Sequence, residues 1–103
     1  MHLLDEEDND MQTALSLSLL EDKHMISRLL ILNGCNVNKG GGKLGSPLHI
    51  AISKMETEII YELLIKGADP TSTDQEGNTP LHLLFQIFSR FPKKSIKIGE
   101  MLI

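Results

Sequence analysis

The sequence lacks tryptophan, contains a single cysteine, and has only 4% aromatic residues in a chain of 103 residues. The shortage of aromatic side chains predicts an aliphatic core, which favours packed short helices over a sandwich of twisted strands. Because Cys35 is alone, no intrachain disulfide can form, and we expect a reducing compartment, the cytoplasm or the nucleus. No apolar run approaches the roughly 20 residues that a transmembrane helix needs, which predicts no membrane span.

The chain also lacks a surplus of positive charge. Its formal net charge is -4, whereas a protein that neutralises many phosphates needs excess lysine and arginine on one face, so we expect no nucleic-acid partner. The one local surplus of cations runs from Arg90 to Lys97. The first ten residues are acidic where a secretory signal peptide would be basic and then apolar, which predicts no such signal.

What the chain does contain is a repeated pattern with a period of 33 residues. The cap-forming residues Thr13, Ser46 and Thr79 recur at this interval, and the glycines Gly34 and Gly67 recur in phase with them. A fixed period of 20 to 50 residues is typical of repeat proteins, in which one supersecondary unit is copied along the chain. The apolar positions that share the period are Leu15, Leu48 and Leu81, then Leu17, Ile50 and Leu83, and Leu30 with Leu63.

Each copy of the repeat predicts two helices. In the middle copy Ser46 can cap the first helix, and Pro47 suits its first position, where an amide N–H would have no partner within the helix. Thr57 can cap the second helix, and Gly67 supplies the left-handed residue that ends it. Residues 68–77 are polar and rich in turn-forming types, which predicts a loop before the next copy.

A resemblance to the ankyrin repeat is carried by three segments: Ser46-Pro-Leu-His-Ile-Ala51, Leu63-Leu-Ile-Lys-Gly-Ala-Asp69 and Asp74-Gln-Glu-Gly-Asn-Thr-Pro-Leu-His82. The resemblance implies an all-α fold, an ankyrin-repeat solenoid of stacked antiparallel helix pairs with hairpin-like loops on one side. It implies a single domain over residues 1–103. The repeats would span about 7–39, 40–72 and 73–103, with an insertion near 88–95 in the third.

The first and third copies differ from the middle one. The first is more polar, with Ser16 in place of His49, as expected of a terminal repeat that faces water. The third matches Met101-Leu-Ile103 to Leu63-Leu-Ile65 only after an insertion of about five residues, and no closing glycine follows. Its last helix would leave apolar residues at an open end, which predicts further repeats, a partner or self-association there.

The third copy also contains all three phenylalanines of the chain. Phe85, Phe88 and Phe91 fall at intervals of three, so a lengthened first helix would align them on one face until Pro92 stops it. We expect Phe85 to pack internally. For the other two, the alternatives are local core that covers the insertion and an aromatic patch that a partner occupies together with neighbouring cations. Those cations are Arg90, Lys93 and Lys94.

Three features that could carry chemistry favour structural roles. His49 and His82 each follow a capping hydroxyl by three residues, where a ring nitrogen can bond the cap, and their spacing suits no metal site. Cys35 stands where Ala68 stands in the next copy, which favours a small buried residue over a nucleophile. The glycine-rich loop 39–43 lacks the serine or threonine that follows the lysine of a phosphate-binding loop. We therefore expect no enzyme activity, no metal and no cofactor.

The expected function is non-catalytic binding of a protein partner, of unknown identity, through the concave side where hairpin tips and first helices line up. Phe88 and Phe91 are the candidate energetic anchors, because aromatic side chains dominate many interfaces. Two alternatives stay open: a regulatory or targeting segment of a larger protein such as a kinase or channel, and a small stand-alone inhibitor. The contact residues predicted by position are Lys43, Gln75, Glu76 and Asn78 on the tips, and Ser53, Lys54 and Gln86 on the helices.

Asn38 is a candidate modification site. The stretch Leu30-Ile-Leu-Asn-Gly-Cys-Asn-Val-Asn38 is similar to the stretch modified by the asparaginyl hydroxylase that acts on many ankyrin proteins. The resemblance implies hydroxylation of Asn38, and the alternative is a plain turn-forming asparagine.

Overall fold

The computed structural model describes residues 13–102, which contain six α-helices and one short 3-10 helix joined by turns and loops. Within these residues there is no β-strand, and the all-α fold expected from the sequence is confirmed. The helices are α1 (Ala14–Leu20), α2 (His24–Leu32), η2 (Gly42–Leu44, the 3-10 helix), α3 (Pro47–Ser53), α4 (Thr57–Ile65), α5 (Pro80–Ile87) and α6 (Pro92–Leu102).

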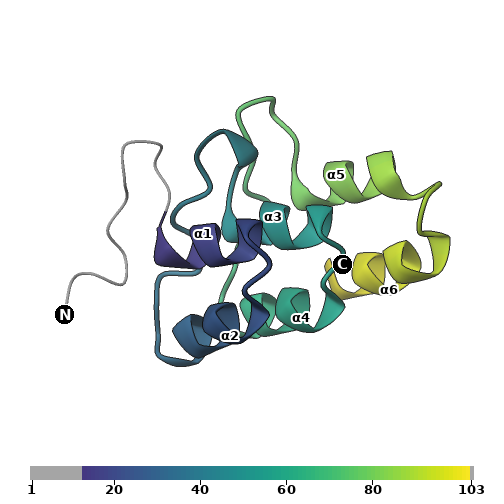
Figure 1. Ribbon diagram of the computed structural model, residues 1–103. Helices are drawn as coiled ribbons and strands as arrows, with labels where there is room; N and C mark the ends of the chain where they lie inside the picture. The colour runs from purple at the N-terminus through teal and green to yellow at the C-terminus, as the bar shows by residue number, and fades with distance from the viewer. Residues whose placement is uncertain (1–12, 103) are drawn as a thin grey trace.

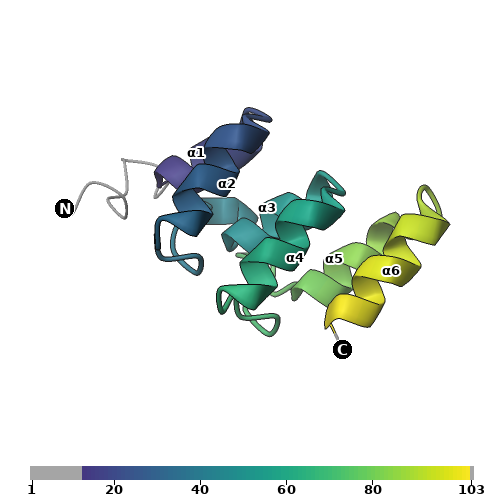
Figure 2. The same ribbon diagram turned by 90° about the horizontal axis from the view of Figure 1, so that it is seen from below.

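The helices form two layers. The first helices of the pairs, α1, α3 and α5, lie in one layer, and α2, α4 and α6 lie in the other (Figure 1, Figure 2). Each helix packs against its partner in the pair and against the matching helix of a neighbouring pair. This nearest-neighbour packing defines a solenoid, so the stack of antiparallel helix pairs implied by the resemblance is confirmed.

The first helix of each pair begins at a capping residue, as the sequence predicts. The hydroxyl oxygens of Thr13 and Thr79 accept the backbone N–H of the residue three positions on. In all three pairs, the side chain at that third position accepts the N–H of the cap, which satisfies amide groups that have no partner within the helix. These bonds join Thr13 to Ser16 at 2.8 Å, Ser46 to His49 at 3.0 Å and Thr79 to His82 at 3.2 Å.

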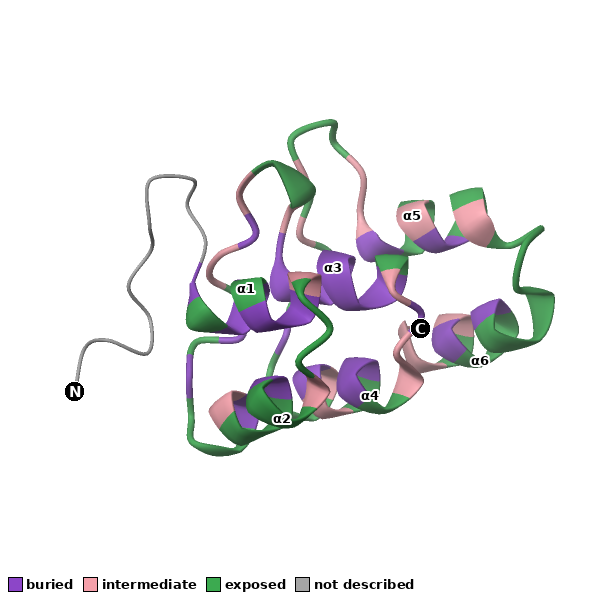
Figure 3. Ribbon diagram, viewed as in Figure 1, coloured by how far each residue is buried: buried purple, intermediate pink, exposed green. Residues whose placement is uncertain are grey.

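The core is a stack of aliphatic side chains between the two layers, where the helices face one another (Figure 3). The middle pair is covered by a neighbour on each side, and Leu48, Ile52, Ile60 and Leu63 are all 0% exposed. Full burial of such a side chain contributes about 1.5–3 kcal/mol. The middle pair is therefore the most firmly packed part of the described chain.

The turn inside each of the first two pairs uses a left-handed residue that is not glycine. Asp22 and Met55 have φ angles of 59° and 56°, a conformation that costs an ordinary residue about 1 kcal/mol. In the middle pair the next amide, that of Glu56, donates back to the Ala51 carbonyl at 3.2 Å. The left-handed residue thus reverses the chain within a few residues and sets the two helices antiparallel.

The third pair does not have the lengthened first helix that the sequence predicts. α5 ends at Ile87, whose carbonyl accepts the N–H of Arg90 at 3.1 Å and that of Phe91 at 3.4 Å, so the chain turns before Pro92. Pro92 begins α6, because proline has no amide N–H to leave unpaired at the first position of a helix. The prediction that Pro92 stops the first helix was wrong.

The extra residues of the third repeat lie at the start of the predicted range 88–95. α6 begins 35 residues after α4, which begins 33 residues after α2, so two extra residues fall in the turn before Pro92. In this register the buried Ile98 takes the place of Leu63. Met101 is therefore not the counterpart of Leu63, and the match predicted between the two helix ends was wrong.

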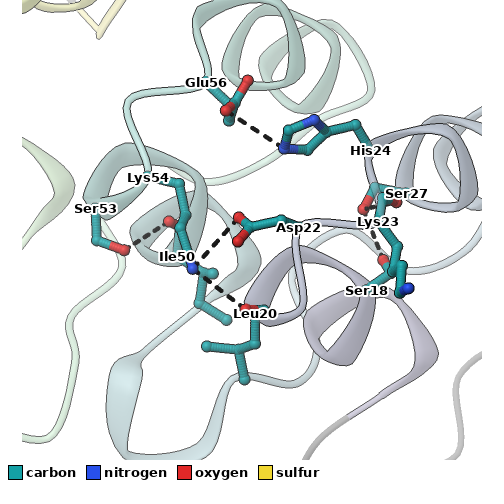
Figure 4. A network of polar contacts seen from close by, with 10 residues as sticks. All are labelled: Ser18, Leu20, Asp22, Lys23, His24, Ser27, Ile50, Ser53, Lys54 and Glu56. Atoms are coloured by element: carbon teal, nitrogen blue, oxygen red, sulfur yellow. Dashed lines mark hydrogen bonds and ion pairs between the residues drawn. The ribbon is translucent and has the colours of Figure 1, made fainter.

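Polar side chains join the first helix pair to the second (Figure 4). The ammonium group of Lys54, at the end of α3, donates to the Leu20 carbonyl at 3.2 Å and lies 3.3 Å from the Asp22 carboxylate. Leu20 is in the last turn of α1, where carbonyl groups lack a partner within the helix and a nearby cation is favoured. His24 Nε2 and Glu56 Oε1 lie 3.3 Å apart in the same network, at ion-pair distance but without hydrogen-bond geometry.

We expect Lys54→Ala to lower the free energy of unfolding by about 1 kcal/mol, because both the bond to Leu20 and the ion pair with Asp22 are lost. For a domain of this size, the melting temperature should fall by about 4–8 °C. Thermal unfolding followed by circular dichroism measures the change. Lys66→Ala is the matched control, because Lys66 is the C-cap of α4 as Lys54 is the C-cap of α3, but Lys66 is exposed. Equal changes in the two variants would contradict this role of Lys54.

Candidate interaction surfaces

The loops that join successive helix pairs offer one exposed surface. The loops before α3 and before α5 both project beyond the layer of first helices, to the same side (Figure 1). Lys43, Gln75 and Glu76 are exposed in these loops, and Gln86 is exposed on α5. We call these four residues the tip surface.

Three other residues predicted to contact a partner also make bonds within the domain. Asn78 donates its backbone N–H to the Asp74 carboxylate at 2.8 Å. Ser53 donates its hydroxyl to the Ile50 carbonyl at 2.7 Å, and Lys54 lies in the network that joins the first two pairs. These bonds hold loop and helix ends in place. Contact of Ser53, Lys54 and Asn78 with a partner stays a prediction.

His49 connects two repeats through its ring. Its Nδ1 atom accepts the Ser46 backbone N–H at 3.0 Å, which assigns the proton of the neutral ring to Nε2. Nε2 then donates to the Asn78 carbonyl at 2.8 Å in the loop of the next repeat. His49 is 1% exposed, and the structural role predicted for it is confirmed. His82 makes the matching bond to Thr79, but its Nε2 has no acceptor within residues 13–102.

Asp74 fixes the tip of the loop before α5. Its Oδ1 atom accepts the backbone N–H groups of Asn78 at 2.8 Å and of Glu76 at 2.9 Å. The bond from Asn78 is the main cause of a pKa below the ordinary value for aspartate. Because the folded-state pKa is lowered, the stabilisation is present above the ordinary pKa of 3.8 and is lost as the pH falls through the folded-state value.

We expect Asp74→Ala to unfold at a lower temperature than the unaltered chain at about pH 6, and the difference should shrink as the pH falls toward about 3. Protonation of Asp74 removes the carboxylate charge from the unaltered chain, and the substitution removes the same carboxylate from the variant, so the two chains become more alike in stability. Melting curves over this pH range measure the effect. Glu76→Ala is the control, because the Glu76 side chain is exposed. A difference in melting temperature that is independent of pH would contradict the assignment.

Two further candidates from the sequence, Cys35 and the glycine-rich loop 39–43, lie where a structural role explains them. Cys35 is 7% exposed, as expected of a small buried residue. In the loop 39–43, Gly41 has a φ angle of 95°, and a Cβ atom there would lie 1.7 Å from the Gly45 carbonyl oxygen, so only glycine fits. Over the described residues, no three His, Cys, Asp or Glu side chains gather into a metal site. None of the helices from α1 to α6 is long and apolar enough to cross a membrane.

Asn38 joins the first two repeats through its side chain. Its Nδ2 atom donates to the Gly67 carbonyl at 3.0 Å, and its Oδ1 atom accepts the Asp69 backbone N–H at 2.7 Å. A hydroxyl group added to the β-carbon would leave this carboxamide intact. Hydroxylation of Asn38 stays a prediction.

We expect Asn38→Ala to destabilise the domain by about 1–2 kcal/mol, because two hydrogen bonds between repeats are lost. Denaturant unfolding measures this change, and an unchanged midpoint would contradict the bridging role.

For the modification, mass spectrometry of the protein from its native cell should find one added oxygen on Asn38. The neighbouring Asn33 and Asn36 serve as internal controls, and an unmodified Asn38 would count against hydroxylation.

The phenylalanines of the third repeat do not share one helix face. Phe85 lies on α5 and is 84% exposed, so the expectation that it packs internally was wrong. No helix pair among the described residues follows α5 and α6 to cover it. Phe88 is the C-cap of α5 and Phe91 precedes α6, and both are exposed. This exposure disfavours the interpretation of Phe88 and Phe91 as local core.

α5 and α6 border an apolar groove of about 460 Å³ at this end of the stack. The groove has His82 and Glu100 toward one end and Phe88 toward the other, because the two helices run antiparallel. Lys94 lines a different hollow, with His24 and Glu56, so the predicted cluster of aromatic and basic residues is divided between two sides of α6. The groove is lined by Leu81, His82, Leu84, Phe85 and Phe88 of the α5 region and by Ser95, Ile96, Gly99 and Glu100 of α6.

Known proteins share the repeated helix pair. The family model described as "Ankyrin repeats (3 copies)" matches residues 1–74. The chain therefore belongs to the ankyrin-repeat family, whose repeats form a non-catalytic module for protein interaction.

Curated relatives match parts of the chain. NF-kappa-B inhibitor alpha of Homo sapiens is 50% identical over 38 residues, which cover 37% of this chain and 12% of the relative. Ankyrin repeat domain-containing protein 9 of Mus musculus is 41% identical over 59 residues, covering 57% and 17%. NF-kappa-B inhibitor zeta of Bos taurus is 28% identical over 89 residues, covering 80% and 12%. The chain thus spans only 12% to 17% of the length of these relatives.

Proposed function

We propose that the domain binds a protein partner through the tip surface and catalyses no reaction. The observation that supports this is the exposure of Lys43, Gln75 and Glu76 on loops that project to one side, with Gln86 exposed on the helix that follows. The loop before α5 is held by Asp74 and by the ring of His49, so it needs little ordering when a partner binds. A preorganised loop loses less conformational entropy on binding, which favours affinity.

The tip surface carries charges of both signs, which favours a partner whose contact face carries the opposite charges at matching positions. Lys43 presents a cation in one loop, and Glu76 presents a carboxylate in the next. Charges on exposed loops of this kind contribute more to partner choice and association rate than to raw affinity. Two relatives are named as inhibitors of NF-kappa-B, which supports regulatory binding as the general role.

For the whole protein, two roles follow as proposals. The domain serves as a regulatory or targeting segment of a larger protein such as a kinase or channel, or it acts as a small inhibitor of its partner. We place it in the cytoplasm or the nucleus, because its one cysteine, Cys35, is suited to a reducing compartment.

We expect the double variant Lys43→Glu with Glu76→Lys to bind the partner at least about tenfold more weakly, because both charges are reversed on the tip surface. Capture of partners from a lysate of the native cell, followed by titration of the captured protein, measures the change. The control is Lys66→Glu with Glu21→Lys, which reverses two exposed charges at helix ends outside the tip surface and keeps the same net charge. Equal capture by all three chains would move the site elsewhere.

A further inference from the structure

The loops before α3 and before α5 border a polar cleft of about 460 Å³. Residues between Asn36 and Ser46 line one wall, and Ser72 and Thr73 line the other. Both loops project to the same side of the stack (Figure 1). In a solenoid, further repeats before α1 or after α6 would add their loops outside this pair, so the cleft would stay open in a longer stack.

Hydrogen bonds fix the spacing between the two walls of the cleft. Asn38, on the first wall, donates its Nδ2 group to the Gly67 carbonyl at 3.0 Å and accepts the Asp69 backbone N–H at 2.7 Å. The Ser72 hydroxyl, on the second wall, donates to the Ser46 hydroxyl at 3.3 Å. A cleft that is already formed loses little conformational entropy when a ligand enters it.

Among the described residues, Lys39 is the only charged residue that lines the cleft. It is half-buried, and its ammonium group makes no ion pair within residues 13–102. Asp69 and Asp74 belong to the second loop but do not line the cleft. Their carboxylates accept hydrogen bonds within that loop, from the Thr71 hydroxyl at 2.6 Å and from the Asn78 backbone N–H at 2.8 Å. The charge that the lining presents to an occupant is therefore positive.

Three further donor groups of the lining residues make no hydrogen bond within residues 13–102. They are the Thr73 hydroxyl and the backbone N–H groups of Gly40 and Gly42. A carboxylate has two oxygen atoms that together accept about four hydrogen bonds, and bonds to an ionised acceptor are stronger than those between neutral groups. A carboxylate therefore complements both the charge of Lys39 and the donors around it.

We propose that this cleft binds the side-chain carboxylate of an aspartate or glutamate residue of the protein partner. The carboxylate would pair with the Lys39 ammonium group and accept from the Thr73 hydroxyl and the glycine N–H groups. One lysine balances one negative charge, whereas a phosphate group carries up to about two and is typically bound by clusters of arginine. The inference rests on the proposed function of protein binding and deepens it, because it names the residue type that the partner inserts between the two loops.

The test follows the backbone amide signals of the full chain by NMR during titration with N-acetyl-glutamate amide, in which the side chain carries the only carboxylate. We expect the signals of Gly40, Gly42 and Thr73 to shift, with a dissociation constant in the millimolar range because the probe is small. N-acetyl-glutamine amide has the same shape without the charge and should leave these signals in place. Lys39→Met should weaken binding at least about threefold, since a partly exposed ion pair is lost, and Lys39→Arg should retain it.

The matched control is Lys23→Met, because Lys23 is an exposed lysine at the start of α2, the end of that helix opposite to the cleft. This variant should bind the glutamate probe as the unaltered chain does, and the melting temperatures of all variants should agree. Equal shifts with the glutamine probe, or binding that survives Lys39→Met, would overturn the proposal. So would larger shifts with inorganic phosphate at the same ionic strength, because the cleft would then prefer phosphate.

The titration also separates this inference from the proposed function. It contains no partner protein, so a failure of the cleft to bind the glutamate probe leaves the test of the tip surface unaffected. Equal capture of the partner by Lys43→Glu with Glu76→Lys would count against the tip surface and would not change the result of the titration.

Discussion

Each helix pair in this protein has an apolar face that it cannot bury by itself, and the structure depends on how that face is covered. In the middle pair Leu48 and Ile52 are fully enclosed because another pair packs beyond them. Period, loop length and helix register all serve to bring one such face against the next. The same face of the third pair, at Leu81 and Phe85, is exposed because no further pair packs on it within the described residues.

The helix pairs could be predicted from the sequence because their signals are local and recur in phase. A hydroxyl residue followed by proline marks a helix start wherever it occurs, and the period places each start in the stack. The third repeat could not be predicted in the same way. Pro92 is compatible with both the end of one helix and the start of the next, and only the burial of Ile98 in the stack decides between them.

The candidate site was predictable where exposure follows from position in the repeat. Lys43, Gln75 and Glu76 are exposed as expected of loop tips. The bonds of Lys54 were not predictable, since the sequence does not show that the end of α1 lies within its reach. The left-handed turn at Met55 was not predictable either. No glycine marks it in the sequence, and packing around Met55 imposes the backbone conformation.

The ring of His49 secures the loop that enters the third helix pair, but the pair itself has a neighbour on one side only among the described residues. In a linear array, a unit held by one neighbour opens more readily than a unit held by two, and it does so without unfolding the rest. A ligand that recognises only the closed form stabilises that form by mass action. A partner that binds the third pair only in its closed form would therefore protect that pair from proteases.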